Sequence, residues 1–309
     1  MAGELESVQK VLRELAKTLK SLPREPMPKQ VHKLRTATRR VEAIAATLVD
    51  KKKSERLLKS IGPLRKAAGG VRDMDVLSSN VRKLERYFEQ NQNSRTLSKS
   101  LPGGFFSGKK PLKGRANGHS YSGSAVASDS LARLVEQIQI ARQHNAVELR
   151  RALGRRRDAA RQNLKQCSKL VQSALIPVSP AASANGREHD GVHSAAMSVV
   201  RELGEWPPLD ASNIHAFRLK VKELRYILQL SADAGSALTG ALGQVQRRIG
   251  DWHDWQQLDE IAREILDPER DGALLTHIGR SVKRRLDQAL AAANALRGKY
   301  LSMPYAQGI

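Results

Sequence analysis

One sequence pattern occurs twice in the chain, as VHKLRTATRRV at residues 31–41 and as IHAFRLKVKELRY at residues 214–226. An α-helix turns by roughly 100° per residue, so the first copy gathers Val31, Leu34 and Val41 on one side. The second copy carries apolar residues at the matching positions. Each copy therefore predicts one amphipathic helix that buries its apolar face.

The border of each apolar face is basic in the same pattern. A histidine is followed by an arginine three positions later and by a basic residue seven positions later, namely His32, Arg35 and Arg39 in the first copy and His215, Arg218 and Lys222 in the second. Arg225 extends the second border. Two helices that only needed solvated faces would not have to repeat this pattern, so these side chains are candidates for binding an anion.

A second element repeats after each helix. GGVRDM at residues 69–74 and GDWHDW at residues 250–255 share a spacing, with Asp73 41 residues after His32 and Asp254 39 residues after His215. Elements repeated in order at nearly equal separation predict two similar halves. Each half would form a small helical bundle, and pairing the bundles would bring the basic borders onto one surface.

Hydrophobic periodicity predicts an all-α fold, and no alternating strand pattern with a hairpin turn is present. The expected helices cover about residues 4–22, 31–49, 54–87 with an interruption or kink near 69–70, 131–175, 195–203, 212–232, 238–261 and 274–296. Residues 91–130 are predicted to be a flexible insertion and residues 177–191 a linker. The expected organisation is one domain with halves at 1–176 and 192–309.

The charge balance predicts a polyanionic partner. The 309 residues include 53 Lys and Arg against 31 Asp and Glu, a formal charge of +22. Nucleic acid, an acidic membrane and inorganic polyphosphate all fit such a surface. Aromatic residues make up only 4% of the chain, which disfavours binding of single strands by base stacking.

Cysteine content and hydropathy indicate the expected compartment. The single cysteine, Cys167, cannot form an internal disulfide, so the cytoplasm is expected. No apolar run reaches the roughly 18 to 20 residues of a transmembrane helix, and no secretory signal is recognisable. We therefore expect no membrane association.

The paired segments at 31–40 and 69–75, and at 214–226 and 249–255, resemble the two halves of the CHAD domain, the conserved-histidine α-helical domain. The resemblance implies two pseudo-symmetric helical bundles with long helices around a basic cleft or pore. It also implies binding of inorganic polyphosphate and an association with polyphosphate granules. It marks as phosphate-binding the residues His32, Arg35, Arg39, Arg40, His215, Arg218, Lys222 and Arg225. Beside the resemblance, basic residues recur along the helices, and we expect Lys220, Arg142, Arg157 and Arg284 to widen this phosphate-binding surface.

The chemistry of such a site needs a dense set of cationic donors. Arginine holds two phosphate oxygens with one planar fork, and lysine supplies a mobile point charge. Asp73 and Asp254 are expected to orient these cations through ion pairs, although carboxylates also bind divalent cations. His32 and His215 either donate to phosphate or hydrogen-bond a neighbouring helix. Glu42, at the position of Arg225, makes the two borders unequal.

Other functions have weaker support in the sequence. Nucleic-acid binding is the main alternative, and the pair His253-Asp254 leaves a metal-dependent polyphosphate or triphosphate hydrolase open. GGFFSGKK at residues 103–110 resembles a phosphate-binding loop but lacks the final Ser or Thr and the flanking strand and helix. We therefore expect a non-catalytic protein without a metal site or cofactor, and the sequence leaves its oligomeric state open.

Overall fold

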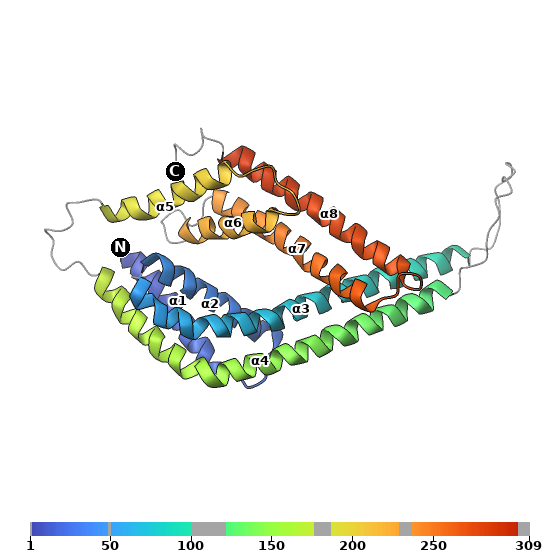
Figure 1. The fold of residues 1–309 in the computed structure, drawn as a ribbon, viewed down its shortest axis with the longest axis horizontal. Coiled ribbons are helices and arrows are strands. Elements are labelled where there is room, and N and C mark those ends of the chain that lie inside the picture. The colour runs from blue at the N-terminus through green and yellow to red at the C-terminus, as the bar shows by residue number, and fades with distance from the viewer. Residues whose placement is uncertain (1, 49–50, 100–121, 176–186, 229–236, 302–309) are drawn as a thin grey trace.

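The computed structural model describes residues 2–48, 51–99, 122–175, 187–228 and 237–301, and within these ranges the chain is helical and contains no strand. The helices are α1 (Ala2–Ser21), α2 (Pro28–Leu48), α3 (Lys51–Lys99), α4 (Ser122–Leu175), α5 (Arg187–Gly204), α6 (Ile214–Leu228), α7 (Ala237–Ile265) and α8 (Gly272–Leu296), followed by a π-helical turn (Arg297–Leu301). The all-α prediction is confirmed. Figure 1 shows α3 and α4 as a long antiparallel pair beneath the pair α7 and α8.

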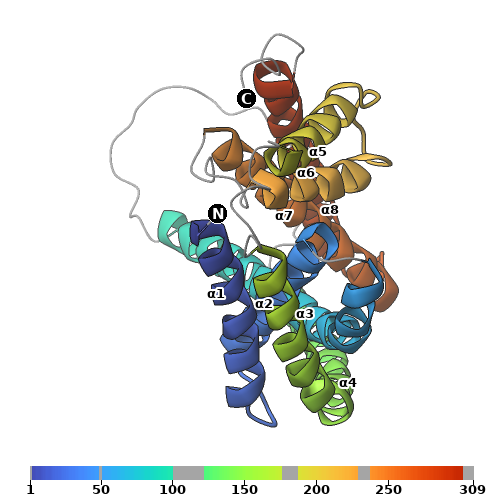
Figure 2. The ribbon, with the colours of Figure 1, turned by 90° about the vertical axis from the view of Figure 1, so that its left-hand side faces the viewer.

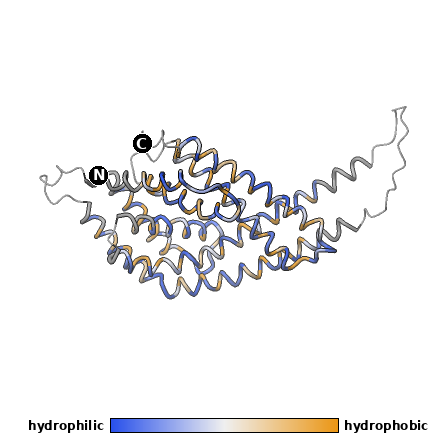
Figure 3. The backbone as a smooth tube through the Cα atoms, turned by 45° about the horizontal axis from the view of Figure 1, so that its top comes forward, coloured by the Kyte–Doolittle hydropathy of each residue, from blue (hydrophilic) through white to orange (hydrophobic). Residues whose placement is uncertain are grey.

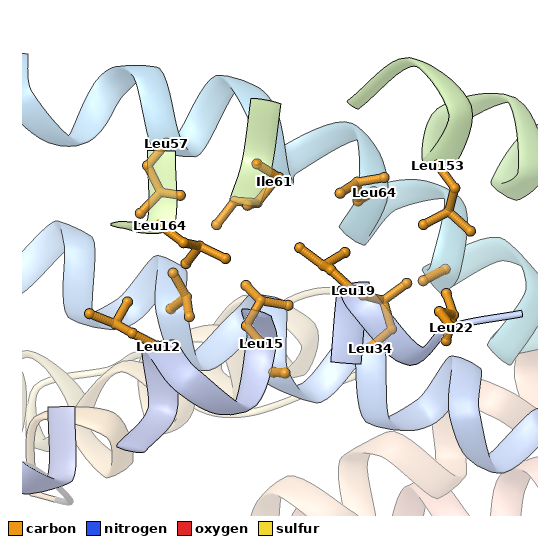
Figure 4. Close-up of a cluster of buried hydrophobic side chains, with 14 of the residues drawn as sticks. Leu12, Leu15, Leu19, Leu22, Leu34, Leu57, Ile61, Leu64, Leu153 and Leu164 are labelled. Carbon is orange, nitrogen blue, oxygen red and sulfur yellow. The ribbon is translucent and has the colours of Figure 1, made fainter. Parts of the chain in front are cut away.

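The first core lies among α1, α2, the beginning of α3 and the end of α4. Its leucines and isoleucines project between the four segments, as Figure 4 shows. Leu15, Leu19 and Leu34 are completely buried there. The same periodicity that predicted the first amphipathic helix therefore seats α2 in this core, with Val31 and Val41 also buried.

A second core lies among α5, α6, the beginning of α7 and the end of α8. Phe217, from the second repeated stretch, is completely buried and its ring meets that of Trp206 edge-on, with centroids 5.6 Å apart. Ile214, Val221 and Leu224 are buried beside it. Both repeated helices thus use their apolar faces in the way that the sequence predicts.

A third core joins the two bundles. It combines the end of α3 and the beginning of α4 with the end of α7 and the beginning of α8. Trp255 is buried in this core, and the guanidinium of Arg285 lies 3.9 Å from the centroid of its ring. Figure 2 gives the end-on view of the two stacked sets of helices, and Figure 3 shows apolar residues recurring along every helix. This core fixes the two bundles relative to each other.

The expected interruption at Gly69-Gly70 is wrong, because α3 continues through both residues. Their small size serves a close helix approach instead. A Cβ on Gly70 would come within 2.8 Å of Asn145 Oδ1 on α4, and Asn145 Nδ2 donates to the carbonyl of Gly70 at 3.4 Å. The glycine therefore lets α4 pack tightly against α3.

The predicted insertion and linker are shorter than the sequence indicates. Helix α3 continues to Lys99 and α4 begins at Ser122, so both ends of the 91–130 segment are helical. Helix α5 begins at Arg187, inside the predicted linker 177–191. The loop-like segment 103–110 lies outside the described residues. Polar helix ends carry no apolar period, which explains why the sequence pattern missed them.

None of the helices in the described part of the chain contains a stretch that is long and apolar enough to cross a membrane.

Asp271, just before α8, fastens this helix to α4. Its side chain is completely buried and accepts hydrogen bonds from Arg133 Nη2 at 2.7 Å and from the backbone N–H of Asp267 at 2.9 Å. Burial alone would raise the pKa of Asp271, but hydrogen bonds from Ser130 and Arg133 outweigh it and lower the pKa to about 2. The ionised carboxylate therefore stabilises the fold.

Replacing this carboxylate by an amide is expected to destabilise the protein. A pKa lowered from 3.8 to about 2 corresponds to about 2 kcal/mol of unfolding free energy for Asp271→Asn at pH 7. Urea titrations measure it. The difference from wild type is present above about pH 4 and disappears as the pH falls through about 2. Asp287→Asn, an exposed change on α8, serves as the control, and an equal loss in both variants would contradict the prediction.

Candidate functional site

The two repeated helices face each other at the boundary between the bundles. Helix α2 contacts α6, and α3 contacts α7, next to them (Figure 1). The basic borders of both helices lie on the facing sides, because their apolar faces are turned into separate cores. The pairing of the two motifs is therefore a result of tertiary packing.

Five cationic side chains lie close enough at this boundary to affect one another electrostatically. We call them the cationic cluster: Arg35 and Arg39 from α2, Arg65 from α3, and Arg218 and Lys222 from α6. Burial, followed by repulsion from the four arginines, lowers the pKa of Lys222 to about 7. The cluster therefore gathers cations of both bundles, of which Arg35 and Arg65 have carboxylate partners and Lys222 has none within the described part of the chain.

Lys222 is the most unusual member of the cationic cluster. The residue is only 8% exposed, and its amine forms no ion pair with a carboxylate anywhere in the described ranges. A buried lysine normally has a carboxylate partner, because an unpaired charge is costly to remove from water. Lys222 is thus a buried amine to which the described residues supply no counter-charge.

Two carboxylates hold the arginines of the cluster. Arg35 Nη1 donates to Asp73 Oδ1 at 2.9 Å, which confirms the predicted ion pair of Asp73. Arg218 interacts electrostatically with Asp254 and more weakly with Asp73. Burial raises the pKa of Asp254 to about 6, against the opposing effect of Arg218. Asp73 therefore restrains Arg35 directly, whereas Asp254 acts on Arg218 through its charge and forms no ion pair with it among the described residues.

The guanidinium of Arg218 lies flat against α7. Its Nε donates to the backbone carbonyl of Gln246 at 3.3 Å, and its Nη2 would be only 2.9 Å from a Cβ on Gly250. The nearest atom of Arg35 to a Cβ on Gly69 would be at 3.9 Å. A glycine one helical turn before the aspartate thus leaves room for an arginine in each half, with the tighter fit in the second.

Glu42 and Arg225 occupy matching positions of the two halves and have opposite charges, yet each forms a polar contact with the helix that follows its own. Arg65 Nε donates to Glu42 Oε1 at 2.7 Å, and Arg225 Nη1 donates to Gln246 Oε1 at 3.0 Å. Arg65 and Gln246 both lie four residues before the glycine of their half. The donor is on α3 and the acceptor on α2 in the first half, whereas the donor is on α6 and the acceptor on α7 in the second. A polar contact is therefore present at this position in both halves.

The two motif histidines are exposed. Burial, followed by the charges of Arg72 and Arg35, lowers the pKa of His32. Burial, followed by Arg218 and Lys222, lowers the pKa of His215, whose ring centroid is 5.0 Å from that of His253. Neither motif imidazole is hydrogen-bonded within the part of the chain that the structure describes.

Several predicted phosphate-binding residues are not brought to the cationic cluster. Lys220 Nζ pairs with Glu202 at 2.9 Å and with Glu223 at 3.2 Å, and Arg40 Nη1 lies 3.4 Å from Glu14 on α1. These partners belong to the individual bundles. Lys220 and Arg40 therefore strengthen helix packing where they lie.

The three candidates from later helices have separate surroundings. Arg142 Nε pairs with Asp75 Oδ1 at 2.7 Å, and Arg157 Nη2 donates at 2.9 Å to the carbonyl of Leu22, just after α1. Arg284 is exposed on α8 and contributes to lowering the pKa of His277. None of them is among the charges that act on Lys222.

Arg65 and Arg72 were missed as site residues because they lie outside the repeated helix itself. Arg72 is next to Asp73 in the position that His253 has before Asp254. Extending the repeat register eight residues back from Asp73 leads to Arg65, but the matching residue of the second half is the uncharged Gln246, so the repeat does not predict a cation there.

Within the described ranges, no three histidine, cysteine or acidic side chains are arranged to hold a metal ion.

A family model of the CHAD domain matches residues 6–263, which contain both repeated helices and both aspartate segments. A search of curated proteins found no match. The family match ends within α7, so α8 lies beyond it.

Proposed function

We propose that this chain, which belongs to the CHAD domain family, binds inorganic polyphosphate through the cationic cluster and does not catalyse its hydrolysis. The observation that carries this function is Lys222, a buried amine near four arginines from both bundles, for which the described residues provide no carboxylate partner. A ligand with closely spaced negative charges supplies the missing counter-charge. His32 and His215 lie at the edges of the same surface.

An internal duplication underlies this binding surface. The first bundle uses α1 to α4 and the second α5 to α8 in the same order, and the motif residues recur at matching positions in both. Two related helices give a repeating ligand two similar sets of donors. The cationic cluster would then form a basic surface at the boundary between the halves.

Polyphosphate suits these donors because it offers phosphate oxygens and no bases. Guanidinium forks bind paired oxygens. Asp73 restricts the movement of Arg35 before the ligand arrives, and the hydrogen bond to the carbonyl of Gln246 does so for Arg218. The binding should weaken as salt rises, because an anionic chain releases counterions when it binds.

Competition distinguishes polyphosphate from nucleic acid. At one salt concentration, polyphosphate of defined length is titrated against the protein bound to labelled RNA or DNA, and the reverse titration is also made. Polyphosphate is expected to displace nucleic acid at much lower phosphate concentration than the reverse. Equal displacement would favour a general polyanion surface, and displacement only by RNA would favour the nucleic-acid alternative.

The non-catalytic part of the proposal has its own test. Purified protein is incubated with polyphosphate and with tripolyphosphate, each with and without divalent cations, and released phosphate is measured. No release above the protein-free control is expected. Release that disappears in His253→Ala and Asp254→Asn would instead support a hydrolase.

A cytoplasmic location on polyphosphate granules follows from this function. Granules present the ligand at high density, so several protein molecules can bind one particle. Fluorescently labelled protein should concentrate on granules, and variants of the cationic cluster should remain dispersed.

Binding is expected to strengthen about tenfold as the pH falls from 8 to 6, because the complex holds Lys222 in its protonated form. The lysine titrates near pH 7, and the histidines, whose pKa values are lowered, add to the effect at the acidic end. Calorimetric titrations at fixed ionic strength measure this dependence.

Two variants separate the contributions to the pH dependence. Lys222→Arg keeps the charge at every pH and should flatten the profile between 8 and 7. His32→Ala should reduce the rise only below about pH 6.5, the usual pKa of histidine. Profiles identical to wild type in both variants would exclude these groups as the source.

A further inference from the structure

Lys220 and Lys222 lie two residues apart on α6 and have opposite surroundings. Lys220 is paired with two glutamates, which raise its pKa. Lys222 is buried, lies within electrostatic range of four guanidinium groups and has no carboxylate partner in the ranges described. The helix turns roughly 200° between the two positions, so one lysine faces its own bundle and the other faces the boundary.

The surroundings of Lys222 change the reactivity of its amine. With a pKa of about 7, roughly three quarters of the amine is neutral at pH 7.5, against about one in a thousand for an ordinary lysine. Only the neutral amine has a lone pair for attack on carbon. The charged groups that act on it come from three helices: Arg35 and Arg39 on α2, Arg65 on α3, and His215 and Arg218 on α6.

The guanidinium groups around this amine would attract one class of reagent. Guanidinium groups bind phosphate oxygens. Arg35 and Arg65 each use one nitrogen in an ion pair with Asp73 and Glu42, and their side chains are still 26% and 39% exposed, so they reach solvent. An electrophile that carries a phosphate is thereby concentrated next to a neutral nucleophile. A neutral electrophile of similar size receives no such attraction.

We infer that Lys222 is a modification site for acyl phosphates, the mixed anhydrides of a carboxylic acid and phosphoric acid. This inference rests on the phosphate binding proposed above for the cationic cluster. The arginines bind the phosphate group of the reagent, and the lysine receives its acyl group. The modification would turn a binding residue into a regulatory one.

The transfer is balanced without any further reactant. The lone pair of Lys222 Nζ attacks the acyl carbon and forms a C–N bond, and the bond from that carbon to the bridging oxygen breaks. The bridging electron pair leaves with the phosphate, and one amine proton passes to the phosphate or to water. The products are an Nε-acyl-lysine and inorganic phosphate, and neither reactant is oxidised or reduced.

The product would weaken polyanion binding. An amide cannot be protonated near neutral pH, so acylation removes one cation from the cluster permanently. It also adds volume in a place where the lysine is already buried. Polyphosphate bound first would block the arginines and keep the amine protonated. The polyphosphate-bound protein would therefore be acylated at Lys222 more slowly than the free protein.

Two acetylating reagents test the inference in the full-length protein. Acetyl phosphate carries the phosphate, and the N-hydroxysuccinimide ester of acetic acid does not. Each is added at pH 7.5 to a low degree of modification, and peptide mass spectrometry gives the occupancy of every lysine. With acetyl phosphate, Lys222 is expected to exceed Lys220 about tenfold, since the gain in neutral amine outweighs the loss of basicity.

The comparison between reagents isolates the role of the arginines. The ratio of acetyl occupancy at Lys222 to that at Lys220 should be about fivefold higher with acetyl phosphate than with the ester. Tripolyphosphate should suppress the acetyl phosphate reaction at Lys222. In Arg39→Gln, acetyl phosphate should no longer favour Lys222 more than the ester does. Arg13→Gln, an exposed change on α1, should keep this difference between the reagents. Circular dichroism confirms that both variants are folded.

Two results would overturn the inference. One is a Lys222 occupancy no higher than that of Lys220 with acetyl phosphate, and the other is the same ratio with both reagents. Because acetylation is read without polyphosphate, selective modification in a protein that fails to bind polyphosphate would reject only the ligand proposed above. Loss of selectivity in a protein that binds polyphosphate would reject only the modification site.

Discussion

Polyphosphate affinity is expected to fall by at least about 100-fold when Arg218 and Lys222 are both replaced by glutamate. The two residues place α6 in the cationic cluster, and the variant would supply carboxylates that neutralise Arg35, Arg39 and Arg65 internally. The remaining arginines would then be engaged before the ligand arrives. Isothermal titration with polyphosphate of one defined length measures the loss.

A matched control is available on α1. Arg13 and Lys17 are exposed, and the structure gives them no ion pair within the described residues, so Arg13→Glu with Lys17→Glu changes the net charge by the same amount. This control should lose only a few-fold in affinity, through the weaker overall field. An equal loss in both double variants would mean that net charge, rather than the cationic cluster, determines binding.

The second large effect is expected from the smallest change, Gly250→Ala. A methyl group there would be 2.9 Å from Arg218 Nη2, so the end of the guanidinium has to shift away from α7. The shift would weaken the 3.3 Å hydrogen bond from its Nε to the carbonyl of Gln246. We expect about a tenfold loss of polyphosphate affinity. The fold should be kept, because alanine favours a helix interior over glycine by about 0.5–1 kcal/mol.

Alanine substitutions at two other glycines serve as comparisons for Gly250→Ala. Gly240 on α7 has nothing within 4 Å of a Cβ, so Gly240→Ala should keep full affinity and gain a little stability. Gly69→Ala brings a methyl group into ordinary contact with Arg35 Nε at 3.9 Å and should have a smaller effect than Gly250→Ala. Equal affinities in all three variants would show that Arg218 does not need its place on α7. Unfolding in urea is measured for each.

Much of the fold could be predicted because the apolar periodicity of most helices indicates which face is buried. The periods of α2 and α6 identified their core residues, including Val31 and Phe217, and both aspartate segments fell on helices. The failures have physical causes as well. Gly70 looked like a helix breaker, but its missing side chain is needed for the approach of Asn145. The helix beyond Gln90 has no apolar period from which to be recognised.

The site was predicted in part. Arg35, Arg39, Arg218 and Lys222 could be found because they recur at fixed spacing, and the tertiary structure brings them together. Arg65 could not be found from the repeated helix, since it comes from α3 and its counterpart Gln246 is uncharged. Arg142 and Arg157 were included for their charge, although Asp75 and the carbonyl of Leu22 already engage them.

Helix formation, the buried face of each helix and the duplicated motif can all be recognised from local sequence patterns. Which cations act together depends on how the helices pack. Lys220 and Lys222 have the same chemistry and lie on the same helix. Lys220 nevertheless pairs with two glutamates, whereas Lys222 is within electrostatic range of four arginines. Hydrophobic periodicity is a local property that fixes the direction of each side chain from its own helix. The charges that a side chain meets depend on helices distant in the sequence, and packing alone brings those helices together.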